Sequence, residues 1–151
     1  MKVCLVGLGN ECFGDDGIGP ALVRALELEG AEKVIAGIKG LQTAFDLIDC
    51  DEVIFVDASF TLDKDYELRE LEPKEGYDPH SNSPAEILAF MKSMGFKGKA
   101  HVLEIKGERA CFPCTLSEEV VERAKEAVKE LEKLGIKVKG IGEIEAECPH
   151  A

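Results

Sequence analysis

Hydrophobic residues fall along the chain in short runs, and amphipathic stretches separate these runs. Val3–Val6 and Val53–Val56 are uninterrupted apolar runs, the pattern of strands that are buried on both faces of a parallel sheet. Apolar stretches at Val34–Ala36 and His101–Ile105 predict two more strands. Polar and apolar residues alternate over Tyr66–Leu71, which indicates an exposed edge strand.

Apolar residues recur at helical spacing between these strands. The spacing predicts helices over residues 18–29, 43–49, 84–94 and 117–134, with a glycine directly after three of them. Ser83-Pro84-Ala85-Glu86 has the sequence of a capping box with proline at the first helical position. Strands that alternate with helices favour an α/β fold. We therefore expect a three-layer α/β/α sandwich with a mostly parallel sheet of about five strands.

The length of 151 residues suits one domain over residues 1–151. Residues 136–151 trail behind the last predicted helix, and we expect them to form a loosely held tail.

The charge balance excludes two classes of partner. The chain carries 18 basic and 30 acidic residues, a net charge of −12, whereas binding to nucleic acid or an anionic membrane needs clustered Lys and Arg. No apolar run approaches the roughly 20 residues that cross a bilayer, and the N-terminus lacks the apolar stretch of a signal peptide. We expect a cytoplasmic protein, and the default in that compartment is that its six cysteines are reduced.

Acidic residues follow two of the predicted strands. Asp15 and Asp16 lie in the loop after the first strand, and Asp57 directly follows Val53–Val56. Ligands of open α/β sheets bind beyond the carboxyl ends of the strands, so the acids of both loops would face one cleft. Asp16 also lies at a helix N-terminus, where the helix dipole favours negative charge. The alternative is that Asp15 or Asp16 is simply a helix N-cap.

His80 completes a candidate metal site. It lies in a loop, behind Pro79 and ahead of the helix that begins near Pro84, and can point into a cleft. Alone it is best interpreted as a solvated loop histidine. Together with Asp16 and Asp57 it forms an Asp/Asp/His set, and two oxygen ligands with an imidazole suit a divalent transition ion.

The glycines after the first strand raise the alternative of a dinucleotide-binding loop. That fingerprint needs glycine or alanine at the position of Cys12 in Gly7-Leu8-Gly9-Asn10-Glu11-Cys12. Two carboxylates at the helix N-terminus would also repel a pyrophosphate. We reject a dinucleotide site in this loop.

Three motifs occur in one order and spacing. They are Gly9-Asn10-x4-Asp15-Asp16-Gly17-x-Gly19 after the first strand, Val56-Asp57-Ala58 at the end of a central strand, and Pro79-His80 ahead of a helix. In these motifs the chain resembles the hydrogenase maturation endopeptidases over residues 1–134. The first motif is quite specific, whereas the other two carry weight only in this arrangement.

The resemblance implies a function. Members of that family remove a C-terminal extension from the large subunit of nickel-iron hydrogenase after nickel has been inserted. Carried over residue by residue, the family's two metal-contacting acids fall on Asp16 and Asp57 and its histidine on His80, which would form both the catalytic and the metal site. The resemblance further implies that nickel arrives with the substrate, without an organic cofactor. The expected partner is the large-subunit precursor, and the protein itself is expected to be a monomer.

The chain departs from the family pattern in two places, and two other functions stay open. The segment Ser59-Phe60-Thr61-Leu62-Asp63 after Asp57 lacks the glycine-proline turn usual in the family, which points to an unusual substrate. The turn Gly37-Ile38-Lys39-Gly40-Leu41-Gln42-Thr43 lacks the acid that members commonly carry there, which weighs against any mechanism with three carboxylates. A non-enzymatic nickel-binding or nickel-delivery module is the main alternative. A thiol oxidoreductase built on Cys111-Phe112-Pro113-Cys114 is another, although we favour a reduced structural pair.

Overall fold

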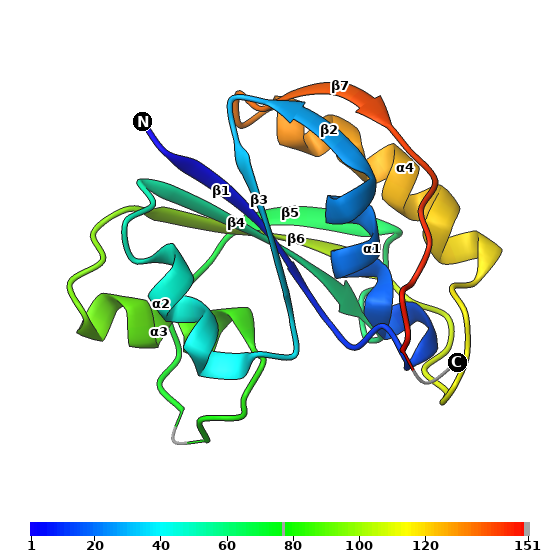
Figure 1. Ribbon diagram of the computed structural model, residues 1–151, viewed down its shortest axis with the longest axis horizontal. Coiled ribbons are helices and arrows are strands. Elements are labelled where there is room, and N and C mark those ends of the chain that lie inside the picture. Colours follow the sequence, from blue (N-terminus) through cyan, green and yellow to red (C-terminus); the bar gives the residue numbers. More distant parts are fainter. Residues whose placement is uncertain (77, 150–151) are drawn as a thin grey trace.

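The computed structural model describes residues 1–76 and 78–149 of the chain (Figure 1). Its central sheet has the strand order β3-β1-β4-β6-β5, in which the first four strands are parallel and β5 runs antiparallel at one edge. The strands are β1 (Val3–Leu8), β3 (Glu32–Gly37), β4 (Glu52–Ser59), β5 (Tyr66–Glu70) and β6 (Lys99–Lys106). The predicted strands, including the edge strand, are therefore confirmed.

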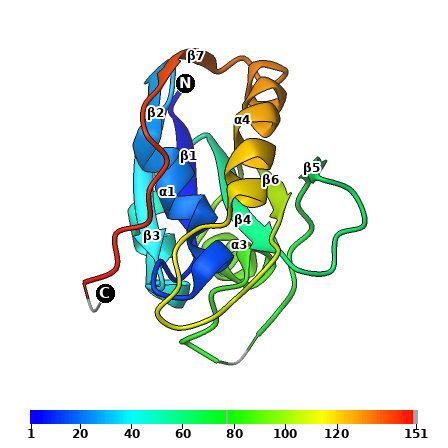
Figure 2. The same cartoon turned by 90° about the vertical axis from the view of Figure 1, so that its right-hand side faces the viewer.

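Helices cover both faces of the sheet (Figures 1 and 2). On one face lie α1 (Ile18–Ala25) and α4 (Glu118–Glu132), and on the other lie α2 (Thr43–Leu47) and α3 (Pro84–Ser93). Side chains alternate along each central strand between the two cores. The core under α1 and α4 contains Leu5, Ile54, Val56, Leu103 and Ile105, and the core under α2 and α3 contains Cys4, Val6, Val53, Phe55 and Val102. This arrangement confirms the three-layer α/β/α prediction.

Two predictions about the chain outside the central sheet are wrong. The helix predicted over residues 18–29 ends at Ala25, and β2 (Leu26–Glu29) follows it as a strand. Its partner is β7 (Lys137–Ile141), which pairs with it in an antiparallel two-stranded sheet. The chain after α4 is thus not a loose tail, because β7 is hydrogen-bonded and the side chains of Ile136 and Ile144 are buried. Residues 142–149, named here the C-terminal segment, continue from β7, and residues 150–151 lie outside the described part.

The starts of α3 and α4 lie at their predicted positions, but only α4 has a side-chain capping hydrogen bond among the described contacts. Ser117 is the N-cap of α4, and its hydroxyl accepts a hydrogen bond from the Val120 N–H at 3.2 Å. Pro84 begins α3 as predicted, but the side chain of Ser83 makes no capping hydrogen bond in the described part of the chain. The capping box is therefore wrong as a hydrogen-bonded motif, although the position of the helix start is right.

The cysteines are paired, which corrects the expectation of reduced thiols. Disulfides join Cys4 to Cys50, Cys12 to Cys148 and Cys111 to Cys114, with Cα–Cα distances of 6.3, 4.8 and 5.3 Å. The expectation rested on compartment alone, whereas the fold brings each pair within bonding distance.

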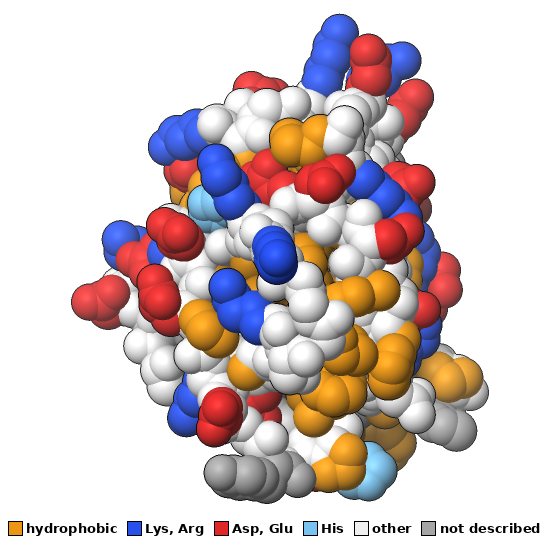
Figure 3. Space-filling model, turned by 90° about the vertical axis from the view of Figure 1, so that its left-hand side faces the viewer, with side chains coloured by type: hydrophobic (Ala, Val, Ile, Leu, Met, Phe, Trp, Pro, Cys, Tyr) orange, Lys and Arg blue, Asp and Glu red, His pale blue; other side chains and the backbone are white. Residues whose placement is uncertain are grey.

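Two surface features complete the fold. Over the described residues, no helix has the length and apolar character needed to cross a membrane. Apolar side chains gather on the face of the molecule formed by α2 and α3 (Figure 3). There the Phe45 ring, 61% exposed, packs edge-on against Phe90 with 5.7 Å between ring centroids.

Candidate active site

Two glycines allow the loop after β1 to fold tightly against the start of α1. Gly9 has a φ of +137°, and a Cβ there would lie 1.9 Å from the Asp16 carbonyl oxygen. A Cβ on Gly19 would lie 2.3 Å from the carbonyl oxygens of both Leu8 and Val56. Only glycine permits these approaches. They hold the short 3₁₀ turn η1 (Gly14–Gly17), which carries both acids, over the carboxyl ends of β1 and β4.

Asp15 is buried and holds the loops of the site together. Its carboxylate accepts hydrogen bonds from the N–H groups of Glu108, Arg109 and Ser117 and from the Ser117 hydroxyl, at 2.7–3.2 Å. Burial alone would raise the pKa of Asp15, but these hydrogen bonds outweigh it and hold the pKa below its usual range. Asp15 is thus ionised and joins η1 to the loop between β6 and α4.

Asp16 and Asp57 form an acidic pair at the carboxyl edge of the sheet. The Asp16 carboxylate accepts a hydrogen bond from the Asn10 N–H at 2.8 Å, and the Asp57 carboxylate accepts one from the Ala58 N–H at 3.0 Å. Burial and the negative charge of Asp16 raise the pKa of Asp57 to about 8, against the opposing effect of the Ala58 N–H. The Asp16 carboxylate is thus close enough for its charge to act on Asp57. The alternative that Asp15 or Asp16 is a helix N-cap is wrong, because neither side chain makes a capping hydrogen bond at the start of η1 or α1 among the described residues.

An acidic pair of this kind can move protons. Near neutral pH Asp57 retains its proton while it lies beside the charge of Asp16. Two carboxyl groups held in different protonation states can act as an acid and a base on one substrate. The same oxygen atoms can bind a divalent cation, which would displace the proton from Asp57.

His80 does not join the acidic pair in this conformation. It is exposed on the loop between β5 and α3, and its backbone N–H donates a hydrogen bond to the Asp78 carboxylate at 2.9 Å. Within residues 1–76 and 78–149, no three His, Cys, Asp or Glu side chains are arranged to hold a metal ion. Of the three predicted ligands, the structure brings two together.

The loop that carries His80 is nevertheless fixed over the same edge of the sheet. The Asn82 side-chain amide donates a hydrogen bond to the Gly37 carbonyl oxygen at 2.7 Å, and the Gly9 N–H donates to that oxygen at 3.0 Å. The Asn82 side-chain oxygen accepts from the Gly40 N–H at 3.2 Å. Sequence reasoning missed Asn82 as the residue that anchors this loop. Its only signal was a position two residues after the histidine and just ahead of α3.

The fold and the acidic pair define an α/β protein with a two-carboxylate site at the carboxyl edge of its sheet. The HybD endopeptidase of Escherichia coli, described as maturing hydrogenase, has the same fold with a TM-score of 0.75 and 20% identity over 95% of this chain and 98% of that one. A hydrogenase 2 maturation peptidase from a Thaumarchaeota archaeon gives a TM-score of 0.65 and 26% identity over 89% of this chain and 99% of that one.

The sequence comparison identifies the family. A Methanocaldococcus jannaschii protein, described as a candidate hydrogenase maturation protease, is 33% identical over 144 residues, which span 84% of this chain and 92% of that protein. No protein-family model matches the chain. The protein belongs to the hydrogenase maturation protease family, and it is accordingly a peptidase.

Proposed function

We propose that this protein is the endopeptidase that removes the C-terminal extension of a nickel-iron hydrogenase large-subunit precursor after nickel has been inserted. The nickel belongs to the substrate, and Asp16, Asp57 and His80 recognise it. The observation that supports this proposal best is the acidic pair, in which burial and the charge of Asp16 raise the pKa of Asp57 to about 8. A protonated carboxyl group in such a place is ready to exchange its proton for a cation.

The chain's own residues would act in sequence. Asp16 and Asp57 accept the substrate's nickel ion, and Asp57 loses its proton as they do so. His80, on an exposed loop anchored by Asn82, approaches the ion as the third ligand. The bound metal site then positions the scissile bond, and a carboxylate of the pair accepts the proton of the attacking water. The absence of an acid in the turn at residues 37–43 leaves this pair as the proton-transferring group.

The decisive experiment compares two forms of the substrate. Purified protein is incubated with nickel-loaded and with nickel-free precursor, and the products are weighed by mass spectrometry. We expect a product shortened at its C-terminus from the loaded form alone. Equal cleavage of both forms would refute metal recognition, and cleavage of neither would refute the proposed substrate.

Variants test the three residues. Alanine in place of Asp16, Asp57 or His80 should abolish cleavage and leave the fold intact, because all three lie at the edge of the sheet or in a loop. Asp78→Ala is the control, since the Asp78 side chain contacts only the backbone N–H of His80 among the described hydrogen bonds. Normal cleavage by two of the three variants would refute the site. A nickel-delivery module would bind nickel without substrate and shorten nothing.

A further inference from the structure

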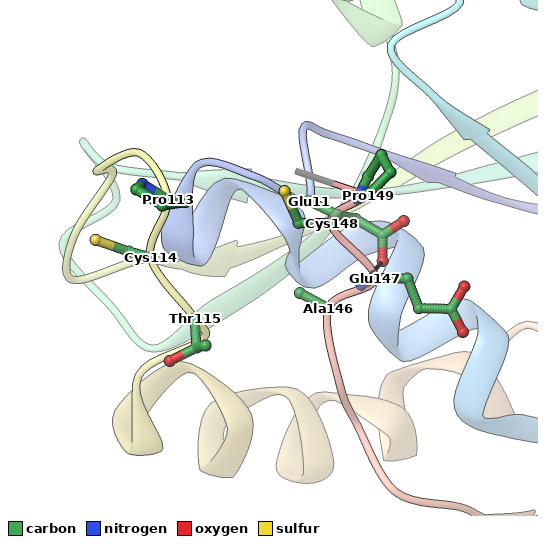
Figure 4. Close-up of a pocket in the computed structure, with 8 residues that line it drawn as sticks. All are labelled: Glu11, Pro113, Cys114, Thr115, Ala146, Glu147, Cys148 and Pro149. Atoms are coloured by element: carbon green, nitrogen blue, oxygen red, sulfur yellow. Dashed lines mark hydrogen bonds between the residues drawn. The ribbon is translucent and has the colours of Figure 1, made fainter. Parts of the chain in front are cut away.

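The C-terminal segment is fastened to the loop after β1 by a group of contacts. Cys148 forms a disulfide with Cys12. The Glu147 N–H donates a hydrogen bond to the Glu11 carboxylate at 3.1 Å (Figure 4). Arg24 in α1 binds both oxygens of Glu11 at 2.8 Å and lies 3.5 Å from the Glu147 carboxylate. The segment is therefore covalently and electrostatically tied to the loop that leads into the acidic pair.

Two hydrogen bonds link the disulfide to Asp16 of the acidic pair through a single residue, Asn10. The Cys12 N–H donates a hydrogen bond to the Asn10 side-chain oxygen at 2.9 Å, and the Asn10 N–H donates to the Asp16 carboxylate at 2.8 Å. A change in the position of Cys12 therefore reaches Asp16 through Asn10.

The same contacts shape a groove beside the loop that leads into Asp16. The groove, of about 370 Å³, is lined by residues 9–13, by residues 37–38 and by Phe112, and its remaining wall is formed by Glu147 and Pro149 of the C-terminal segment. The rings of Phe13 and Phe112 lie 5.5 Å apart, centroid to centroid. Most of this lining is apolar, and the groove shares Gly9 and Asn10 with the loop that holds Asp16.

We propose that the Cys12–Cys148 disulfide is a redox-sensitive clasp that completes this groove as the subsite for an apolar side chain of the substrate next to the scissile bond. The inference rests on the proposed function, because it takes the acidic pair as the place of cleavage. With the clasp closed, the C-terminal segment forms the wall of the groove. With the clasp open, the wall and the loop before Asp16 both loosen.

The clasp is accessible to a dithiol reductant. A cavity of about 590 Å³ lies between the C-terminal segment and residues 113–115, and Cys148 lines it (Figure 4). A thiolate of the reductant attacks Cys148 Sγ and forms a mixed disulfide, which releases Cys12 as a thiol. The second thiol of the reductant then releases Cys148, so two electrons and two protons pass to the protein and the reductant leaves as a disulfide. The Cys4–Cys50 disulfide is less exposed, since its side chains are only 1% and 4% exposed.

The structural part of the proposal is tested without substrate. Hydrogen exchange is measured on the full chain before and after treatment with dithiothreitol, with thiol alkylation to count the opened disulfides. We expect faster exchange in residues 9–16 and 142–149 once Cys12 and Cys148 are alkylated, and the same in oxidised Cys148→Ser. Unchanged exchange in both segments after the disulfide has opened would overturn the clasp, whatever the substrate is.

The functional part is tested by steady-state kinetics on nickel-loaded precursor. Opening the clasp should raise KM about tenfold, the change expected when an apolar side chain loses most of its burial. Cys148→Ser should show the raised KM and no further response to dithiothreitol. The Cys111→Ser/Cys114→Ser variant should still respond, because it retains the clasp, and Cys50→Ala should behave as the wild type does.

Substitution of two exposed phenylalanines tests the role of the groove separately from the role of the disulfide. Phe112→Ala should raise KM to a similar extent, whereas Phe60→Ala, an exposed phenylalanine outside the groove lining, should not. A KM that is unchanged both by reduction and by Phe112→Ala overturns the subsite. Failure of every form to cut the precursor refutes the proposed function instead, and hydrogen exchange still decides whether the clasp exists.

Discussion

Asp15 and Asp16 are neighbours in the sequence, yet the fold gives them opposite tasks. Asp15 points inward and receives four hydrogen bonds from the loop before α4 and from Ser117 at its start. Asp16 points to the edge of the sheet and lies beside Asp57. The sequence predicts acids at the carboxyl edge of the sheet, where ligands of open α/β sheets bind, but it does not predict which acid is structural. That distinction depends on residues about 100 positions away.

Substitution separates the two tasks. Asp15→Ala leaves four hydrogen-bond donors without their acceptor, two of them on the buried residue Ser117, and should lower the free energy of unfolding by roughly 3 kcal/mol or more. Asp16→Asn should change that free energy by less than about 1 kcal/mol and abolish cleavage. Urea unfolding and precursor cleavage of both variants make the comparison. Equal losses of stability would contradict the division of roles.

Asp57 should make stability fall as the pH rises. Its pKa in the folded protein is about 8, against an ordinary value of 3.8, so between these values the folded chain binds one more proton than the unfolded chain. The contribution of Asp57 is fully present below about pH 4 and is lost as the pH rises to 8, at about 1 kcal/mol per pH unit. Asp57→Asn removes this dependence.

Urea unfolding of metal-free wild type and Asp57→Asn at pH 5 and pH 8 measures the effect. The stability of the variant relative to the wild type should increase between the two pH values. Parallel pH dependences would show that Asp57 ionises normally. Asp57→Glu serves as the control, because it retains a titrating carboxyl group.

At the scale of elements, the local pattern of apolar residues predicts those strands whose formation depends on burial alone. The apolar runs at residues 3–6 and 53–56 lie between two helical layers, so their composition predicts strands in the central sheet. The helix prediction is wrong for Leu26-Glu27-Leu28-Glu29, because these residues pair with β7, which lies more than a hundred residues further on. Its polar and apolar alternation is that of a strand, and the helical spacing upstream concealed it.

The candidate site likewise has a part that the sequence predicts and a part that it does not. The positions of Asp16 and Asp57 follow from strand ends that are neighbours in the sheet, which a sequence pattern can predict. The placement of the His80 loop depends on hydrogen bonds between Asn82, Gly37 and Gly40, residues from two distant loops. No periodicity encodes such contacts, and for this reason the third member of the set stays a prediction.

The segment after α4 offers a matched test of the corrected tail. Ile144→Ala removes a side chain that is 8% exposed, and Ile141→Ala removes one that is 41% exposed. We expect the first to lower the free energy of unfolding by about 2–4 kcal/mol and the second by less than about 1 kcal/mol. Urea unfolding measures both. Small and equal effects would restore the loosely held tail.

At the scale of the whole molecule, a disulfide joins the C-terminal segment to the loop after β1. The Cys12–Cys148 disulfide joins residues 136 positions apart, so it closes nearly the entire chain into one loop. The Cys4–Cys50 disulfide closes a loop of 46 positions and the Cys111–Cys114 disulfide one of 3. A disulfide stabilises chiefly by restricting the unfolded chain, and the restriction grows with the length of the loop.

Loop length therefore sets an order for the three disulfides. The chain-entropy relation gives about 5 kcal/mol for Cys12–Cys148, about 4 for Cys4–Cys50 and about 2 for Cys111–Cys114. Urea unfolding of oxidised Cys148→Ala, Cys50→Ala and Cys114→Ala should show losses of stability in that order. Cys50 is more buried than Cys148, so Cys50→Ala also loses packing and can lose more stability than Cys148→Ala for that reason. A loss for Cys148→Ala no greater than that for Cys114→Ala would show that the loop around Cys12 and the C-terminal segment stay together in the unfolded state without the disulfide.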